Sequence, residues 1–254
     1  MLDDHSLSSW GWRIPFALGA VIGLIGMYIR RRLTEPEVYR SLEETGQRER
    51  RPLSTMAAGH RRGAWFVFGI SIAGSVITYM WLTYLPMYAV LTAHANKADA
   101  QLANTIALAF FVVVLPLAAL LSDRFGRRPT MLVYAAAFVI LPFPLLSMLG
   151  SSFGSVLVVS FVGMAFLALN HSNLATVFAE LFPPQVRTIG IALPYAISNA
   201  IFGGTAPSVM QFFGSRGNLW AVPLYVSVCL VTGLFFFFMK ETKNVDTHDV
   251  EMHA

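Results

Sequence analysis

Long apolar segments, separated by short polar or charged connections, run through most of the chain. Between Pro129 and Ala179 there is no Asp, Glu, Lys or Arg. That stretch is long enough for two bilayer spans of about 20 residues each. A soluble helix needs a polar face, and this stretch offers none. Seven helices are predicted, at about residues 13–29, 64–91, 101–121, 131–149, 155–179, 188–213 and 219–239. The pattern therefore indicates an all-α, polytopic membrane protein.

The composition excludes several other classes of protein. Of the 254 residues, 56% are hydrophobic and 13% are charged, whereas a soluble domain carries about 25% charged residues. A single cysteine, Cys229, allows neither an intrachain disulfide nor a cysteine metal cluster, and we expect no metal site and no cofactor. The net charge is +4, but the basic residues lie between apolar segments, so no nucleic-acid partner is expected. No ligand set such as H-E-x-x-H is present, and we expect no enzyme.

The distribution of Lys and Arg predicts how the helices are oriented, because basic residues collect on the cytoplasmic side of a membrane. When alternate connections are assigned to opposite sides, fifteen basic residues fall on one side and three on the other. The three are Arg13, Lys97 and Arg216. We therefore expect the amino terminus outside and the carboxyl terminus in the cytoplasm.

A long charged connection divides the chain unevenly. One helix precedes it and six follow, which suggests that the first belongs to a missing amino-terminal bundle. The predicted parts are residues 1–29, the last helix of that bundle; residues 30–63, a cytoplasmic central loop; residues 64–240, a six-helix carboxy-terminal bundle; and residues 241–254, a cytoplasmic tail.

Proline and glycine interrupt several predicted spans. In lipid, each proline frees a backbone carbonyl that a neighbouring helix or a water-lined cavity must satisfy. Broken helices of this kind are common where a substrate passes, although proline and glycine are also frequent in membrane helices generally. The positions are Pro86, Pro116, Pro142, Pro144, Pro194, Gly203, Gly204 and Pro207.

The segment Ser122-Asp123-Arg124-Phe125-Gly126-Arg127-Arg128-Pro129 lies between the third and fourth predicted spans. Asp123 ends a helix next to arginines that can pair with it, and Gly126 permits a tight turn. An ordinary basic cytoplasmic loop is the alternative interpretation. The segment resembles a loop of the major facilitator superfamily, found between helices eight and nine of its twelve-helix fold. The resemblance implies that the seven helices correspond to helices six to twelve.

Two further regions resemble the metabolite:proton symporter family within that superfamily. They are Trp10–Phe16 with Tyr28–Pro36, and Glu180–Arg187 with Ala200–Pro207. The similarity is greater to carriers of α-ketoglutarate than to those of citrate and of proline or betaine. It implies a bacterial inner-membrane protein that takes up a small organic acid by proton symport, with substrate, protons and membrane lipid as its partners. The alternative is a non-transporting, truncated or partner-binding protein of the same fold.

The fifth predicted span carries several polar residues. Asn170, Asn173 and Glu180 recur on one helical face. The two asparagines could donate to a substrate carboxylate or bond to a neighbouring helix, and Glu180 is expected to pair with Arg187. His171 could act as a proton relay, because histidine titrates near neutral pH, or could bond to another helix.

The second and sixth predicted spans complete the candidate site. Tyr195 and Asn199 are one helical turn apart. Tyr84 could line a cavity or belong to an aromatic belt at the outer interface. The expected substrate cavity therefore comprises Tyr84, Asn170, Asn173, Tyr195 and Asn199, and the expected conformational loop comprises Asp123, Arg124, Gly126, Arg127, Arg128, Glu180 and Arg187.

No charged residue lies in the middle of a predicted span. A carboxylate normally binds to Arg or Lys through charge-assisted hydrogen bonds. For an anionic substrate, that partner must come from the missing helices or be replaced by amide donors and helix ends. The proton carrier is likewise either His171 or a residue of the absent half.

Overall fold

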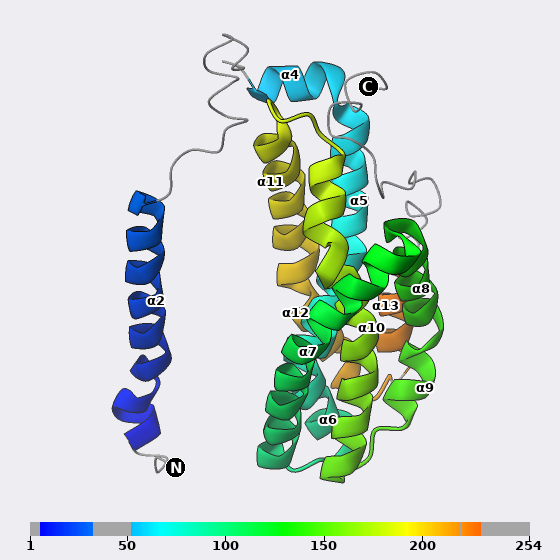
Figure 1. Ribbon diagram of the computed structural model, residues 1–254. Helices are drawn as coiled ribbons and strands as arrows, with labels where there is room; N and C mark the ends of the chain where they lie inside the picture. Colours follow the sequence, from blue (N-terminus) through cyan, green and yellow to red (C-terminus); the bar gives the residue numbers. More distant parts are fainter. Residues whose placement is uncertain (1–5, 33–51, 219, 230–254) are drawn as a thin grey trace. The chain divides into compact units, whose positions relative to one another are not determined.

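The computed structural model describes residues 6–32, 52–218 and 220–229. The chain separates into two compact units, residues 1–48 and 49–254, and each is described by itself. All regular structure in the described ranges is helical (Figure 1). The all-α fold class predicted from the sequence is therefore confirmed.

The first unit contains one long helix. A short π-helix, η1 (Leu7–Gly11), precedes α2 (Arg13–Arg32). The 20 residues of α2 give a length of about 30 Å, which matches the hydrocarbon thickness of a bilayer. None of its residues is buried by the rest of this unit, and three arginines lie in its last turn. The predicted helix at residues 13–29 is confirmed.

The second unit is a bundle of helices. Its elements are α4 (Pro52–Gly59), α5 (Arg61–Thr78), η2 (Tyr79–Tyr84), α6 (Leu85–Ala93), α7 (Lys97–Phe125), α8 (Arg127–Ile140), α9 (Pro142–Ser147), α10 (Phe153–Glu180), α11 (Arg187–Ser198), η3 (Asn199–Gly203), α12 (Gly204–Gly214) and α13 (Ala221–Cys229). The short helix α4, which lies across one end of the bundle in Figure 1, falls within the segment expected to be a loop.

Five helices in the described residues are long and apolar enough to cross a membrane: Ser9–Arg32, Arg61–Ala93, Lys97–Phe125, Phe153–Glu180 and Arg187–Gly214. The predicted span at 131–149 is instead divided at Leu141 into α8 and α9. Pro142 and Pro144 explain the break, because neither can donate a backbone hydrogen bond. Of the predicted span at 219–239, α13 covers its first part, and the remainder lies outside the described residues.

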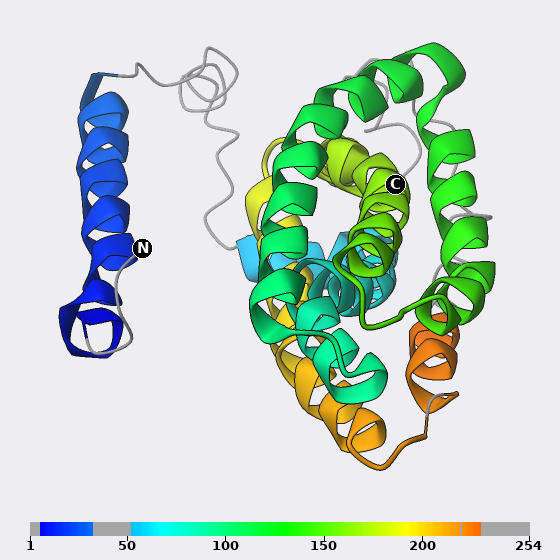
Figure 2. The same ribbon diagram turned by 90° about the horizontal axis from the view of Figure 1, so that it is seen from below.

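The centre of the bundle is formed by α5 and α10, each of which contains more buried residues than any other described helix. Helix α10 packs against α7 and α8, α5 packs against α11 and η3, and the two central helices also contact each other. Seen from below, α7, α8 and α9 curve around α10 (Figure 2). Polar residues on α5 and α10 are therefore enclosed by protein.

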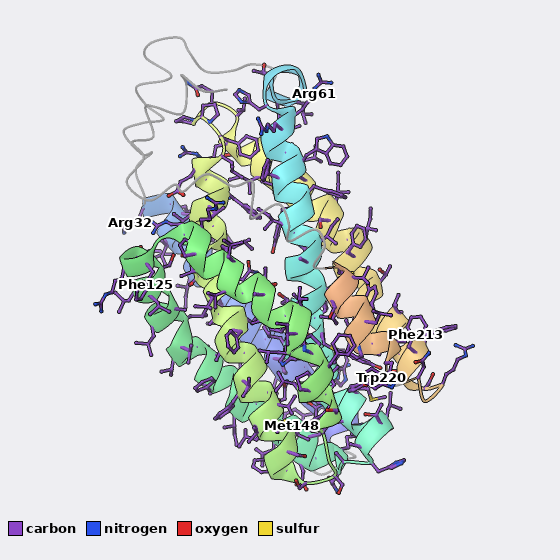
Figure 3. The ribbon with its side chains drawn as sticks, turned by 90° about the vertical axis from the view of Figure 1, so that its right-hand side faces the viewer. Arg32, Arg61, Phe125, Met148, Phe213 and Trp220 are labelled. Atoms are coloured by element: carbon purple, nitrogen blue, oxygen red, sulfur yellow. The ribbon has the colours of Figure 1, made fainter. Side chains whose placement is uncertain are left out.

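The two ends of the bundle differ in charge. Arg61 and Met148 lie at opposite ends (Figure 3). The basic residues at the α4 end are Arg61, Arg62, Arg124, Arg127, Arg128 and Arg187. At the other end, the described basic residues are Lys97 and Arg216. This is the distribution on which the predicted orientation rests, with the α4 end in the cytoplasm.

One interrupting proline has its freed carbonyl satisfied by a neighbouring helix, as expected. Pro86 has no backbone N–H that could bond to the carbonyl of Leu82, four residues earlier. Leu82 itself lies in the π-helical segment η2. The side chain of Asn104 on α7 supplies the missing donor: its Nδ2 lies 3.2 Å from the Leu82 carbonyl oxygen. Asn104 is buried, so it compensates for the proline inside the protein.

Replacing Asn104 with alanine should destabilise the bundle, because the Leu82 carbonyl would be left without this donor. We expect a loss of about 1–2 kcal/mol. Thermal unfolding of the purified protein in detergent would measure it. Thr105→Val is the matched control, since Thr105 is exposed and its hydroxyl bonds within its own helix. An unchanged melting temperature for Asn104→Ala would contradict this role.

Candidate functional site

Three hydroxyl side chains form a polar stripe along α5. Ser71, Ser75 and Thr78 follow one another at intervals of four and three residues, which places them on one helical face. Ser71 and Ser75 are buried. The stripe lies near the middle of the span Arg61–Ala93. Polar groups are costly at that depth in a membrane and usually face a bundle interior or a functional cavity.

The stripe meets the junction of α11 and η3 through Asn199. The hydroxyl of Ser75 lies 2.8 Å from Asn199 Oδ1 and 2.6 Å from the Ser71 carbonyl oxygen, and it can donate its one proton to either. Asn199 Nδ2 donates to the Tyr195 carbonyl of its own helix at 3.2 Å. This contact joins two membrane spans that are 124 residues apart in sequence.

The same stripe meets α10 through His171 and Asn170. His171 Nε2 lies 3.4 Å from the Thr78 hydroxyl oxygen. Asn170 lies against Gly74 so closely that a Cβ atom at position 74 would be 3.3 Å from its Nδ2. A glycine at this position therefore lets the backbone of α5 approach the Asn170 amide. We call Ser71, Ser75, Thr78, Asn170, His171 and Asn199 the intramembrane polar cluster.

The cluster has hydrogen-bonding capacity that the chain does not use. Asn170 is fully buried, yet neither its Oδ1 nor its Nδ2 has a hydrogen-bond partner among the described residues. The Ser71 hydroxyl is also buried without such a partner. An unsatisfied buried group costs about 1–3 kcal/mol, and in a native structure it calls for a ligand, water or ion. The arrangement can therefore both donate and accept hydrogen bonds in the middle of the bundle.

The structure does not bring every predicted cavity residue into this cluster. Asn173 is buried and donates to the Leu169 carbonyl of its own helix at 2.8 Å. Tyr84 is the last residue of η2, six residues after Thr78, and its hydroxyl lies 3.4 Å from Gln211 Oε1. Tyr195 is 40% exposed, with its ring edge against Phe178. Roles for Tyr84, Asn173 and Tyr195 in a cavity remain predictions.

The serines of α5 belong to the cluster but were not among the predicted site residues. The available signal in the sequence was the spacing of Ser71, Ser75 and Thr78, which places three hydroxyl groups on one helical face. Within an apolar span, single serines are inconspicuous because they can bond to their own helix, as Ser75 does. The contact with Asn199, which is visible only in the structure, distinguishes Ser75 from a serine that bonds only to its own helix.

A second group of polar residues connects helix ends at the α4 end of the bundle. Gly126 joins α7 to α8 with φ 106° and ψ 158°, a conformation that favours glycine. Arg127 then pairs with Asp123 one turn earlier, at 2.8 Å. Arg127 Nε also lies 3.7 Å from Glu180 Oε1 at the end of α10. The tight turn and the Asp123–arginine pair expected from the sequence are both present.

The expected partner of Glu180 is corrected by the structure. Glu180 faces Arg127, whereas Arg187 Nε donates to the Phe182 carbonyl at 3.1 Å. Arg187 begins α11 and bonds back to the connection that precedes it, while the packing of α8 on α10 brings Arg127 to Glu180. Arg124 lies with its guanidinium 5.6 Å from the ring centroid of Phe125. A conformational role for this loop remains a prediction, and so does one for Arg128.

No metal-binding group of three or more His, Cys, Asp or Glu side chains occurs in residues 6–32, 52–218 and 220–229. The polar cluster contains neutral donors and acceptors, and histidine is its one titratable member. Its chemistry suits the recognition of a small polar molecule by hydrogen bonds.

The chain is similar in sequence to several known proteins. The α-ketoglutarate permease of Escherichia coli K12 is 36% identical over 253 residues, covering 95% of this chain and 56% of the permease. The glycine betaine/proline/ectoine/pipecolic acid transporter OusA of Dickeya dadantii is 31% identical over 258 residues, covering 96% of this chain and 51% of that protein. The proline/betaine transporter of Escherichia coli K12 is also 31% identical, with the same coverage. The chain thus spans about half the length of these relatives.

No solved structure matches the chain. The family model for the Major Facilitator Superfamily, however, matches residues 90–252. These relatives are permeases or transporters by name, and none is named as an enzyme. With more than half of the sequence covered by the family model and multiple apolar helices in the structure, this multi-pass membrane protein belongs to the major facilitator superfamily.

Proposed function

We propose that the chain forms helices six to twelve of a secondary transporter, and that this transporter takes up a small organic acid, such as α-ketoglutarate, together with protons. The observation that carries the proposal is the buried, unpartnered amide of Asn170 in the intramembrane polar cluster. A transport site near the bilayer midplane needs polar groups that the protein itself leaves available. The similarity to the α-ketoglutarate permease supports the choice of a carboxylate substrate.

The cluster would bind the substrate through neutral groups. The Asn170 amide and the serine hydroxyls can donate to carboxylate oxygens. No Asp, Glu, Lys or Arg lies in the apolar parts of the described spans, so the negative charge of the substrate needs a cation from elsewhere. An amino-terminal bundle, corresponding to the additional length of the relatives, would provide it.

His171 is the proposed proton carrier of this half. It is the titratable side chain of the cluster, and its Nε2 faces the Thr78 hydroxyl. Protonation of His171 would place a positive charge beside the substrate carboxylate, which links substrate binding to proton binding. The same proposal includes a bacterial inner-membrane location, an external amino terminus and a cytoplasmic carboxyl terminus.

Two helix irregularities adjoin the cluster. Thr78 immediately precedes η2, and Asn199 begins η3. π-Segments within membrane helices are frequent at functional sites, and alternating access often uses discontinuous helices around a central site. Rocking of this bundle against an amino-terminal one would expose the cluster to each side in turn, while the Asp123–Arg127–Glu180 group would stabilise one of the end states.

Uptake by proteoliposomes would test the proposal. Both this chain alone and the product of the whole reading frame that contains it would be reconstituted, with labelled α-ketoglutarate, proline and glycine betaine as substrates. We expect saturable α-ketoglutarate uptake by the whole product under an acid-outside gradient, and its collapse when a protonophore is added. Uptake of proline or glycine betaine instead of α-ketoglutarate would contradict the proposed substrate and assign the transporter to that compound. An absence of uptake of all three, together with a stable protein complex, would favour the non-transporting, partner-binding alternative.

A further inference from the structure

Two arginines at the start of α5 have no acidic partner among the described residues. Arg61 and Arg62 are both exposed, and neither forms an ion pair with another described residue. Figure 3 shows Arg61 at the extreme end of the helix. In sequence they follow Arg48, Arg50 and Arg51, so residues 48–62 contain five arginines and one acidic residue, Glu49. The sequence that leads into the span Arg61–Ala93 therefore carries a high density of positive charge.

Exposed apolar groups accompany this charge. Trp65, four residues after Arg61 and therefore on the same face of α5, is 64% exposed. Leu53 of α4 is 53% exposed. Helix α4 carries no charged residue and lies across the end of the bundle (Figure 1), where it packs against α5 and α11. We call Leu53, Arg61, Arg62 and Trp65 the α4–α5 patch.

This combination fits the boundary between lipid headgroups and acyl chains. Tryptophan prefers that depth because its ring is apolar and its N–H is polar. Arginine one turn further out reaches the headgroup phosphates, which its guanidinium can bind in a bidentate manner. Clusters of four or more basic residues next to a membrane span are typical of binding to anionic lipid.

We propose that the α4–α5 patch is a binding surface for anionic phospholipid headgroups, which anchors α4 and the start of α5 at the membrane surface. Charge complementarity selects this occupant: the patch presents two exposed guanidinium groups, which form no ion pair with a described residue, beside exposed apolar side chains. A phosphatidylglycerol molecule supplies both a phosphate and acyl chains. The inference is independent of the transported substrate.

Thermal unfolding of the purified chain in detergent would test this, with phosphatidylglycerol or phosphatidylcholine added at equal mole fraction. We expect phosphatidylglycerol to raise the melting temperature more than phosphatidylcholine does, and the double variant R61Q/R62Q to lose at least half of that difference. About 0.5 M NaCl should reduce the difference for the unaltered chain, because salt screens exposed charges. The matched control is K97Q/R216Q, which removes two basic residues from the opposite end and should retain the full difference.

Several results would overturn the proposal. One is an undiminished lipid effect in R61Q/R62Q, and another is an equal reduction in both double variants, which would indicate only net charge. If R61Q/R62Q lowers the melting temperature equally in both lipids, the arginines bind another part of the protein. If inorganic phosphate stabilises the chain as much as phosphatidylglycerol does, the patch is a simple anion site.

Discussion

Asn170→Ala should abolish most substrate uptake by the whole transporter while leaving the folded bundle about as stable as before. The Asn170 amide has no described hydrogen-bond partner, so its removal breaks no such bond and relieves an unsatisfied buried group. Any substrate carboxylate that binds there would lose its donor. A hydrogen bond to a charged group is worth about 1.5–3 kcal/mol, which corresponds to roughly a 10- to 150-fold lower uptake rate at low substrate concentration. Initial uptake rates, normalised to folded protein, would measure the loss.

Asn104→Ala is the matched control, because it removes the same side chain from another buried position, on α7. Asn104 does have a partner, the Leu82 carbonyl. We therefore expect the opposite pattern, with lower stability and nearly normal uptake per folded molecule. If Asn170→Ala destabilises the protein and leaves uptake unchanged, Asn170 is a structural residue that bonds to a neighbouring helix. The comparison thus separates the two interpretations that the sequence left open.

Gly163→Ala should cause a large loss of stability, although it adds only one methyl group to the bundle. A Cβ atom at Gly163 on α10 would overlap Nε1 and Cδ1 of the Trp81 indole ring. Trp81 is fully buried, and its Nε1 donates to the Val159 carbonyl at 3.3 Å. The ring also packs edge-on against Phe138. Because the indole cannot move without losing these contacts, we expect a cost of about 3 kcal/mol or more, seen as a melting temperature lower by about 6–12 °C.

Gly154→Ala on the same helix is the control, since a Cβ atom there meets nothing within 4 Å. It should leave the melting temperature unchanged or raise it slightly, as alanine is the better helix former. A double-mutant cycle with Trp81→Ala gives a second check. Once the ring is absent, Gly163→Ala should cost little, so the two changes should be strongly non-additive. Additive effects would show that the close approach of α10 to Trp81 is not the cause.

Uptake by the variants also separates folding from transport. Gly163 and Trp81 hold α5–η2 against α10, the two elements that bring Thr78 and His171 together. A loss of uptake in Gly163→Ala should therefore follow the loss of folded protein. In Asn170→Ala it should occur without such a loss, and that difference distinguishes a site residue from a packing residue.

The sequence by itself determined the helical class, the positions of most spans and the superfamily. Hydropathy depends on local composition, so long apolar runs such as residues 101–121 predict a membrane helix whatever surrounds them. The turn at Gly126 and the ion pair between Asp123 and an arginine were also predictable, because each involves only residues that are close together in the sequence. Residues 131–149 were predicted as one continuous span, although Pro142 and Pro144 were signals for the break that the structure shows at Leu141.

Only the tertiary structure decided which polar groups meet. The partner of a buried side chain depends on which helix faces it and on the rotation of each helix about its axis, and neither follows from local composition. Ser75 meets Asn199 across 124 residues, Glu180 faces Arg127 instead of Arg187, and Asn104 satisfies the carbonyl freed by Pro86. The sequence could mark Asn170 as a costly polar residue in a membrane helix. Packing alone left its amide buried beside Gly74 without a partner among the described residues, because α5 and α10 approach each other closely at that point.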